Sequence, residues 1–346
     1  MSSTEIGTSG DDLNIQQFGG QAVIEGVMMR SAHCVSVACR TPDGKIVTRT
    51  ERIDSSMMRY LGWLNWPFAR GTLALLDAMV LGARALNFAS RLQLDDKSLS
   101  NEQNRTTSSQ LKDIAVGGTV VLSLVLGLLI FKVLPTVITT IAVAQGLLPG
   151  KNDPHLLNLS DGVIRMVMFF GYILLVSRMD QIHRVFMYHG AEHKAINTLE
   201  AGMPLSLEDA TKASRIHPRC GTSFIFIVLM LDLILITVLP RPQSLLLRIA
   251  LQISVIPVVA GIAYEAIKAA GKYRRNLLVA AVFAPGMATQ YLTTREPEPD
   301  QIEVALTALH SVIAAERTYV QNAALQTEGN DTVPIPSAEA STPGTI

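Results

Sequence analysis

Four long apolar segments occupy the middle of this 346-residue chain and restrict its fold more than any other feature. They cover residues 114–134, 161–177, 223–239 and 245–264. A membrane-spanning helix needs about 20 mostly apolar residues, with about 17 as the lower limit. So many such segments in close succession are unusual for the buried helices of a soluble protein. The sequence therefore predicts a mainly α-helical, polytopic membrane protein with about four transmembrane helices.

Composition supports this class and excludes others. Only 17% of the residues are charged, whereas a soluble domain has about 25%. The formal net charge is zero, so no overall field attracts nucleic acid, and no nucleic-acid partner is expected. Three cysteines are too few for a disulfide scaffold, and none of them forms a CxxC pair. The expected partner is the lipid bilayer, and a substrate, a protein partner or a homo-oligomer is left open.

The positions of lysine and arginine predict the orientation in the membrane. Basic residues precede the first apolar segment, fill the 178–222 loop and follow the fourth segment, whereas the opposite connections contain few. Because cytoplasmic loops carry the excess of basic residues, we expect both termini and the 178–222 loop to be cytoplasmic. The apolar stretch 135–148 leaves the span count open, because a further crossing would reverse everything after it.

The regions outside the apolar segments differ in character. Polar tails at 1–17 and 321–346 are expected to be disordered. In the N-terminal cytoplasmic or interfacial region, 18–112, a Pro-Asp-Gly turn at 42–44 predicts a β hairpin. Interfacial and soluble helices are expected over 266–320.

A helix predicted over 68–91 carries a polar residue at every seventh position. Seven residues are nearly two helical turns, so these residues form one narrow stripe on an otherwise apolar helix. The stripe consists of Arg70, Asp77, Arg84 and Arg91. It fits a helix at the membrane surface, or in a buried interface, better than a true span.

The strongest chemical signal is the run from Tyr188 to Lys194, which contains His189, Glu192 and His193. The two histidines stand four residues apart, so both lie on one face of a helix and can reach one ion. The pattern H-x-x-E-H is an inverted zinc-peptidase motif. It predicts a divalent metal, most simply Zn²⁺, held by both histidines, with Glu192 as the general base. The alternative is a solvated helix with two surface histidines.

A catalytic zinc needs a third protein ligand. His217 and Glu265 are the preferred candidates, because both are expected at the same membrane face as the histidine pair. Cys220 and Glu25 are further candidates on that side. Cys220 could equally be a small buried residue, and Glu265 could simply end a helix.

Asp232 lies near the middle of the third apolar segment. A carboxylate at that depth costs on the order of 3 kcal/mol on insertion scales, so it is expected to face a partner or a cavity. Lys132 or Arg248 could pair with it, whereas Arg165 and Arg248 lie nearer the segment ends and could extend to the surface. Attachment between helices explains such a pair more simply than a transport site does.

Several segments together resemble the YqhQ-like family, which consists of bacterial membrane proteins of unknown function described as predicted metal-dependent enzymes. The resemblance covers roughly residues 18–310. It rests on residues 19–30, 70–71, 188–194, 217–224, 264–265 and 290–297. It implies a multi-pass protein of the bacterial plasma membrane and a metal role for His189, Glu192, His193 and His217, but no substrate.

Two hypotheses about function follow from the sequence. The first is a metal-dependent enzyme of hydrolase or peptidase type, with its site at the cytoplasmic membrane surface. The second is a non-enzymatic membrane factor, such as a transporter subunit or an assembly scaffold, suggested by the polar stripe on 68–91 and by Asp232.

Overall fold

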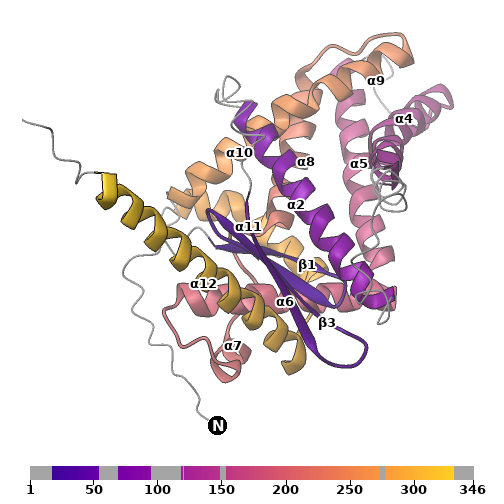
Figure 1. Ribbon diagram of the computed structural model, residues 1–346. Helices are drawn as coiled ribbons and strands as arrows, with labels where there is room; N and C mark the ends of the chain where they lie inside the picture. The colour runs from indigo at the N-terminus through magenta and orange to yellow at the C-terminus, as the bar shows by residue number, and fades with distance from the viewer. Residues whose placement is uncertain are drawn as a thin grey trace, which may run out of the picture.

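The computed structural model contains a β-sheet enclosed by helices and a set of long apolar helices beside it (Figure 1). The predicted tail 1–17 and residues 331–346 of the second predicted tail fall outside the part of the chain that the structure describes. The described residues are 18–53, 69–94, 118–119, 121–148, 153–272 and 277–330.

The N-terminal region forms one antiparallel sheet with the strand order β1-β2-β3-β4. Its strands are β1 (Gly19–Val23), β2 (Gly26–Arg30), β3 (Cys34–Arg40) and β4 (Ile46–Arg52). The predicted hairpin is confirmed, because β3 pairs with β4 across a turn in which Gly44 has φ 86°. The apolar run 21–30 forms a second hairpin, in which the β1–β2 turn holds Glu25 at φ 49°.

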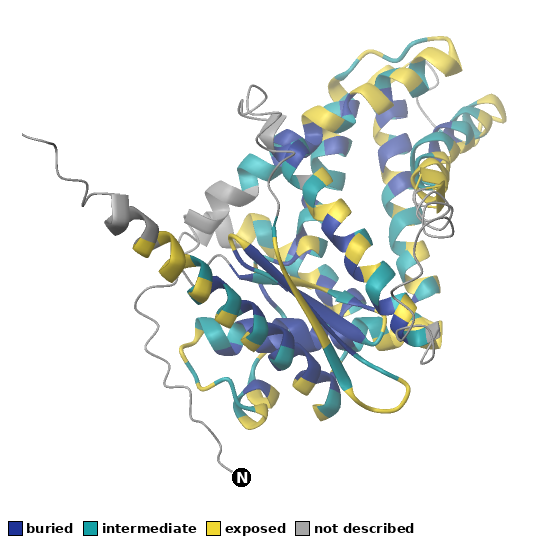
Figure 2. Ribbon diagram, viewed as in Figure 1, coloured by how far each residue is buried: buried dark blue, intermediate teal, exposed yellow. Residues whose placement is uncertain are grey.

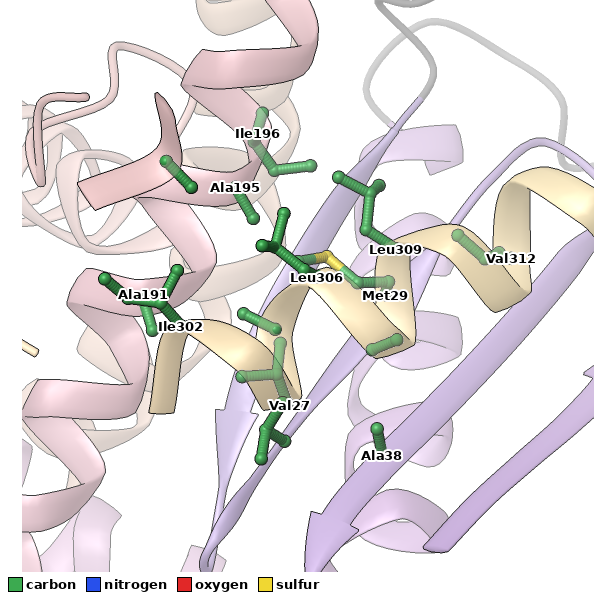
Figure 3. Close-up of a cluster of buried hydrophobic side chains, with 14 of the residues drawn as sticks. Val27, Met29, Ala38, Ala191, Ala195, Ile196, Ile302, Leu306, Leu309 and Val312 are labelled. Atoms are coloured by element: carbon green, nitrogen blue, oxygen red, sulfur yellow. The ribbon is translucent and has the colours of Figure 1, made fainter. Parts of the chain in front are cut away.

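The two central strands, β2 and β3, are buried on both faces, whereas β4 is mostly exposed. Successive strand residues point to opposite sides, so Val27 and Met29 face one layer and Met28 the other. One layer is α2 (Ala69–Leu94), and the other contains α6 (Asp180–Glu200) and α12 (Pro299–Asn330). Figure 2 shows the buried strands in dark blue, and Figure 3 shows side chains of α6 and α12 against the sheet.

Within the described residues, five helical segments are long and apolar enough to cross a membrane. They indicate a membrane protein in contact with the lipid bilayer. Four of them correspond to the predicted spans, so the predicted count of about four is approximate. The fifth lies within α2, which the sequence placed at the membrane surface. The segments are Gly71–Gln93, Val121–Ala144, Pro154–Val176, Gly221–Val238 and Leu245–Ala266.

The first span resolves the question of the apolar stretch after Pro135. The helix Val121–Ala144 runs through a π-helical segment, η4 (Leu129–Val133), and continues as α4 (Leu134–Ala144). The stretch therefore lengthens the first span and makes no separate crossing. The second span is α5 (Pro154–Val176).

The remaining spans are α8 (Gly221–Val238) and the pair α9 (Leu245–Ser254) and α10 (Ile256–Lys272). The sequence suggested one continuous helix for the last span. The helix is interrupted at Val255, next to Pro257, which has no N–H to donate to a helical carbonyl.

The predicted 178–222 loop is largely helical, because it contains α6 and α7 (Leu207–Lys212). The apolar segment after it in the C-terminal region is α11 (Leu277–Thr293). Helix α12 continues to Asn330, beyond the expected end at residue 320. The sheet, α6 and α12 pack together beside the apolar helices, so three regions expected at one membrane face are neighbours (Figure 1).

Candidate metal centre

Helix α6 carries the H-x-x-E-H motif on a buried surface. Its residues from Tyr188 to Thr198 are mostly buried, whereas its first turns are exposed. Gly190 permits the burial, because a Cβ there would lie 2.2 Å from the carbonyl oxygen of Arg295. The segment after α11 is fixed at the same place by a hydrogen bond from the Arg295 amide to the Phe186 carbonyl (2.9 Å). The histidines are therefore not on a solvated helix.

Backbone carbonyl groups orient both histidine rings. Nδ1 of His189 lies 2.9 Å from the Thr293 carbonyl oxygen, and Nδ1 of His193 lies 2.6 Å from that of Arg215. Since a carbonyl only accepts, each Nδ1 must donate, so in the neutral imidazole Nε2 is the nitrogen that carries the lone pair. Metal-binding histidines are commonly fixed in this way by a carbonyl at the other nitrogen.

Cys220 completes a compact group with the two histidines. Its Sγ lies 3.2 Å from His189 Nε2, and one ligand atom each from His189, His193 and Cys220 lie within 4.8 Å of one another. Cys220 is the N-cap of α8, where its sulfur accepts a hydrogen bond from the Thr222 amide (3.4 Å). A helix N-terminus stabilises negative charge, so this position suits a thiolate ligand.

The Nε2 atom of His193 is the most informative atom in the group. The His193 side chain is 1% exposed, and its Nε2 has no hydrogen-bond partner among the described residues. A buried acceptor without a partner costs about 1–3 kcal/mol. An electrophile bound between the three residues would remove that cost.

Glu192 borders the same space. One of its carboxylate oxygens lies 3.8 Å from His193 Nε2 and 4.0 Å from His189 Nε2. Burial raises the pKa of Glu192 above its usual value, although His189, His217 and a hydrogen bond from the Gly20 backbone lower it in part. Gly20 must be glycine for this approach, because a Cβ would lie 2.8 Å from Glu192 Cγ.

His217 lies beside the histidine pair but outside the compact group. Its ring is 5.8 Å from that of His193, and its Nε2 is 3.2 Å from a Glu200 oxygen. Gln290 fixes its backbone by accepting from the His217 amide (2.9 Å) and donating to its carbonyl (2.7 Å). Glu200, which the sequence did not single out, also pairs with Arg219.

A cavity of about 360 Å³ adjoins the group and gives it an open side. Its walls come from β1 and β2, α2, α6 and the start of α8. It brings together His189, Glu192 and Cys220 with Arg30 and Arg219. The cavity is large enough for a small substrate next to the candidate ligands.

The structure places the other candidate ligands elsewhere. Glu25 forms a two-point ion pair with Arg184, at 2.6 Å for both contacts, and accepts from the Tyr188 hydroxyl (3.2 Å). The hydrogen bonds from Arg184 hold the pKa of Glu25 below its usual value despite partial burial. Glu265 lies on α10, next to Tyr264, and is not among the described residues that line the cavity.

Asp232 lies in a separate polar cluster within the apolar helices. It pairs with Lys132 (2.6 Å), as one of the two expected alternatives, and with Arg165. Arg165 therefore does not extend to the surface, because its side chain is 2% exposed. It also donates to Gln252 (3.0 Å), whereas Arg248 bonds Thr140 and the Pro242 carbonyl.

Comparison with known proteins gives a family but no reaction. Residues 66–315 match the family described as "Protein of unknown function (DUF1385)". The chain is 32% identical over 314 residues to the uncharacterized protein YqhQ of Bacillus subtilis (strain 168), covering 88% of this chain and 95% of that protein. No solved structure matches this chain. These matches agree with the YqhQ-like resemblance, and neither description names a metal or an enzyme.

Proposed function

The chain belongs to the DUF1385 family of proteins of unknown function, and we propose that it is a membrane-bound, metal-dependent hydrolase. Its site would lie at the cytoplasmic surface of the bacterial plasma membrane. The proposal rests above all on one observation. Two carbonyl-oriented histidines and a helix-capping cysteine bring one ligand atom each within 4.8 Å of one another, and the Nε2 atom of His193 is buried without a described partner.

The donor set fits zinc. Zinc in proteins takes nitrogen and sulfur ligands in tetrahedral geometry, and catalytic sites keep three protein ligands and one open position. His189, His193 and Cys220 would supply two nitrogens and one thiolate, and the cavity adjoins this group. Cys220 would thus take the place that the sequence gave to His217 or Glu265. A zinc ion, when bound, acts as a Lewis acid and supports hydrolysis of amide, ester or phosphate bonds.

Glu192 would serve as the general base. It touches the cavity and lies within 4.0 Å of both Nε2 atoms, so it can take a proton from an attacking water and pass it to a leaving group. Burial raises the pKa of Glu192 above its usual value, which favours its holding a proton during the reaction. His217 lines the cavity and is held by Glu200. It would keep the cavity wall that faces α2 in position.

The orientation follows from the basic residues of the loops. The 178–222 region, rich in lysine and arginine, packs with the sheet and α12, so one face of the membrane would carry the whole site. We infer that this face is cytoplasmic.

The competing proposal, a non-enzymatic membrane factor, draws support from Asp232. Its pairing with Lys132 and Arg165 is explained by attachment between helices.

Metal analysis of the purified full-length protein tests the proposal. We expect about one zinc per chain in the wild type and loss of that zinc in His193→Ala. His183→Ala is the matched control, because His183 lies on the same helix but is exposed. Equal zinc in both variants, or a folded wild type that binds no zinc from solution, would contradict the proposal.

A further inference from the structure

A second cavity, of about 310 Å³, lies between the sheet and α2. It shares Met28 and Leu81 with the first cavity, but none of the three candidate ligands lines it. Its rim carries three arginines and a single acidic residue, Glu51. The arginines are Arg49 of β4 and Arg84 and Arg91 of α2. Two of them belong to the stripe of polar residues at seven-residue spacing, which the proposed hydrolase does not use. We call this cavity the basic groove.

The three arginines of the groove differ in their partners. Arg49 pairs with Glu51 and lies 6.0 Å from the Phe88 ring centre. Arg91 donates to the side-chain oxygen of Asn87 (2.8 Å). Arg84 is exposed and has no ion pair within the described part of the chain. Three guanidinium groups and one carboxylate line the cavity, and the charge of Arg84 is the one available to an anion.

The floor of the groove is apolar. It is formed by Met28, Val35 and Val37 of the sheet and by Leu81 and Ala85 of α2. A free phosphate ion would gain nothing from such a floor. An amphiphile, with an anionic head at the rim and carbon atoms on the floor, would use both parts of the groove.

Helix α2 also presents an apolar face to the outside. Leu76, Met79, Val80 and Leu86 are all more than 40% exposed. Leu81 belongs to the face of α2 that packs on the sheet. Arg84 and Arg91 are about 60–80° around the helix from Leu81, so they lie between that face and the exposed apolar face. An apolar face flanked by arginines is the arrangement of a helix at the boundary between lipid tails and headgroups.

We propose that the basic groove binds the headgroup phosphate of an anionic membrane phospholipid and thereby fixes α2 against the bilayer surface. The apolar helices of the chain bring the groove to the membrane, and its charge is complementary to anionic headgroups. This inference does not depend on the proposed metal centre.

The test is a lipid titration of the full-length protein in neutral detergent, with bound lipid counted by native mass spectrometry. Phosphatidylglycerol should bind the wild type in preference to phosphatidylcholine. Arg84→Gln combined with Arg91→Gln should weaken phosphatidylglycerol binding by roughly tenfold or more, since each arginine near the surface contributes to anionic-lipid attraction. Arg178→Gln, an exposed arginine directly after α5, is the control and should change binding less than about twofold.

Three outcomes would overturn the proposal. Equal binding of the two lipids would exclude recognition of a negative headgroup. An unchanged affinity in the double variant would place the lipid site elsewhere. Full displacement of phosphatidylglycerol by equimolar inorganic phosphate would indicate a simple phosphate site. A zinc measurement on the same samples keeps this test separate from the metal proposal, because the double variant should retain wild-type zinc.

Discussion

Two buried polar groups in this protein differ in how completely their atoms are paired. In the cluster around Asp232, both carboxylate oxygens are held by a cation, one from Lys132 and one from Arg165. In the group around His193, the oriented Nε2 atom has no partner among the described residues. Both groups are shielded from water, so the difference does not come from exposure.

This difference distinguishes buried polar groups that stabilise the fold from buried polar groups that can bind a ligand. A buried charge is tolerated when it is paired and hydrogen-bonded, and the Asp232 cluster meets this condition except at Nε of Arg165, which has no described partner. Arg165 is nevertheless held through its two terminal nitrogens. In the group of His189, His193 and Cys220, the His193 Nε2 atom instead remains available for a ligand. Changes to the first group should therefore cost stability, and changes to the second should cost binding.

The largest effect is expected for Asp232→Asn. Removing one partner of a buried ion pair costs about 3–5 kcal/mol, because Lys132 and Arg165 would remain buried without a counter-charge. Thermal unfolding in detergent measures this loss. A variant that unfolds like the wild type would show that the cluster is solvated and would remove the contrast.

A compensated variant serves as the control for that experiment. Replacing Lys132, Arg165 and Asp232 together by methionine, leucine and leucine removes every member of the ion cluster at once. Because buried ion pairs can often be replaced by apolar residues without loss, most of the stability should return. Persistent destabilisation would mean that the individual hydrogen bonds to Gln252 matter more than the charges.

An intermediate effect is expected for Glu316→Gln, in a third network outside the membrane helices. Glu316 accepts from the Ser31 hydroxyl (2.6 Å) and the His33 amide (3.1 Å). Burial raises its pKa, but these bonds and the His33 ring lower it more, so the pKa lies below the usual 4.5. Losing hydrogen bonds to a charged group should cost about 1.5–3 kcal/mol near neutral pH.

The lowered pKa of Glu316 also predicts how its contribution to stability changes with pH. Since the folded protein binds the Glu316 proton more weakly than the unfolded chain, its contribution is present above pH 4.5 and is lost as the pH falls through the folded-state pKa. Unfolding measured against pH should show a smaller decline for Glu316→Gln than for the wild type in that range. Parallel curves would contradict the assigned hydrogen bonds.

The smallest effect on stability is expected for Glu192→Gln. The change removes a buried charge but keeps an acceptor for the Gly20 amide, so the free energy of unfolding should change by less than about 1 kcal/mol. Zinc content should stay at the wild-type level, whereas a hydrolytic activity, once assayed, should be lost. A large loss of stability would group Glu192 with the structural network around Asp232.

The sequence predicted the elements of the fold better than their contacts. Apolar length predicted four helical segments that the structure contains, and the Pro-Asp-Gly turn predicted a hairpin. The β1–β2 turn was not predicted, because Glu25 adopts a positive φ that its residue type does not favour. The Arg165–Asp232 pair was also missed, because it depends on how α5 and α8 are rotated against each other.

The same limit applies to the candidate site. The spacing of His189 and His193 predicted their common face, but the third position depended on tertiary packing. Sequence order gives the membrane side of a residue but not its distance from the histidine pair. For this reason the sequence favours His217 and Glu265, whereas the structure brings Cys220 to the pair. The carbonyl groups of Thr293 and Arg215 orient the rings. Because every residue has a backbone carbonyl, the residue types give no sign of this role.

X-ray absorption spectroscopy of the zinc-loaded wild-type protein tests the central claim most directly. If His189, His193 and Cys220 hold the ion, the spectrum should contain one sulfur at about 2.3 Å and two or more nitrogen or oxygen neighbours at about 2.0–2.1 Å. Cys220→Ser should remove the sulfur contribution and leave the lighter neighbours. A wild-type zinc shell without sulfur would contradict the account.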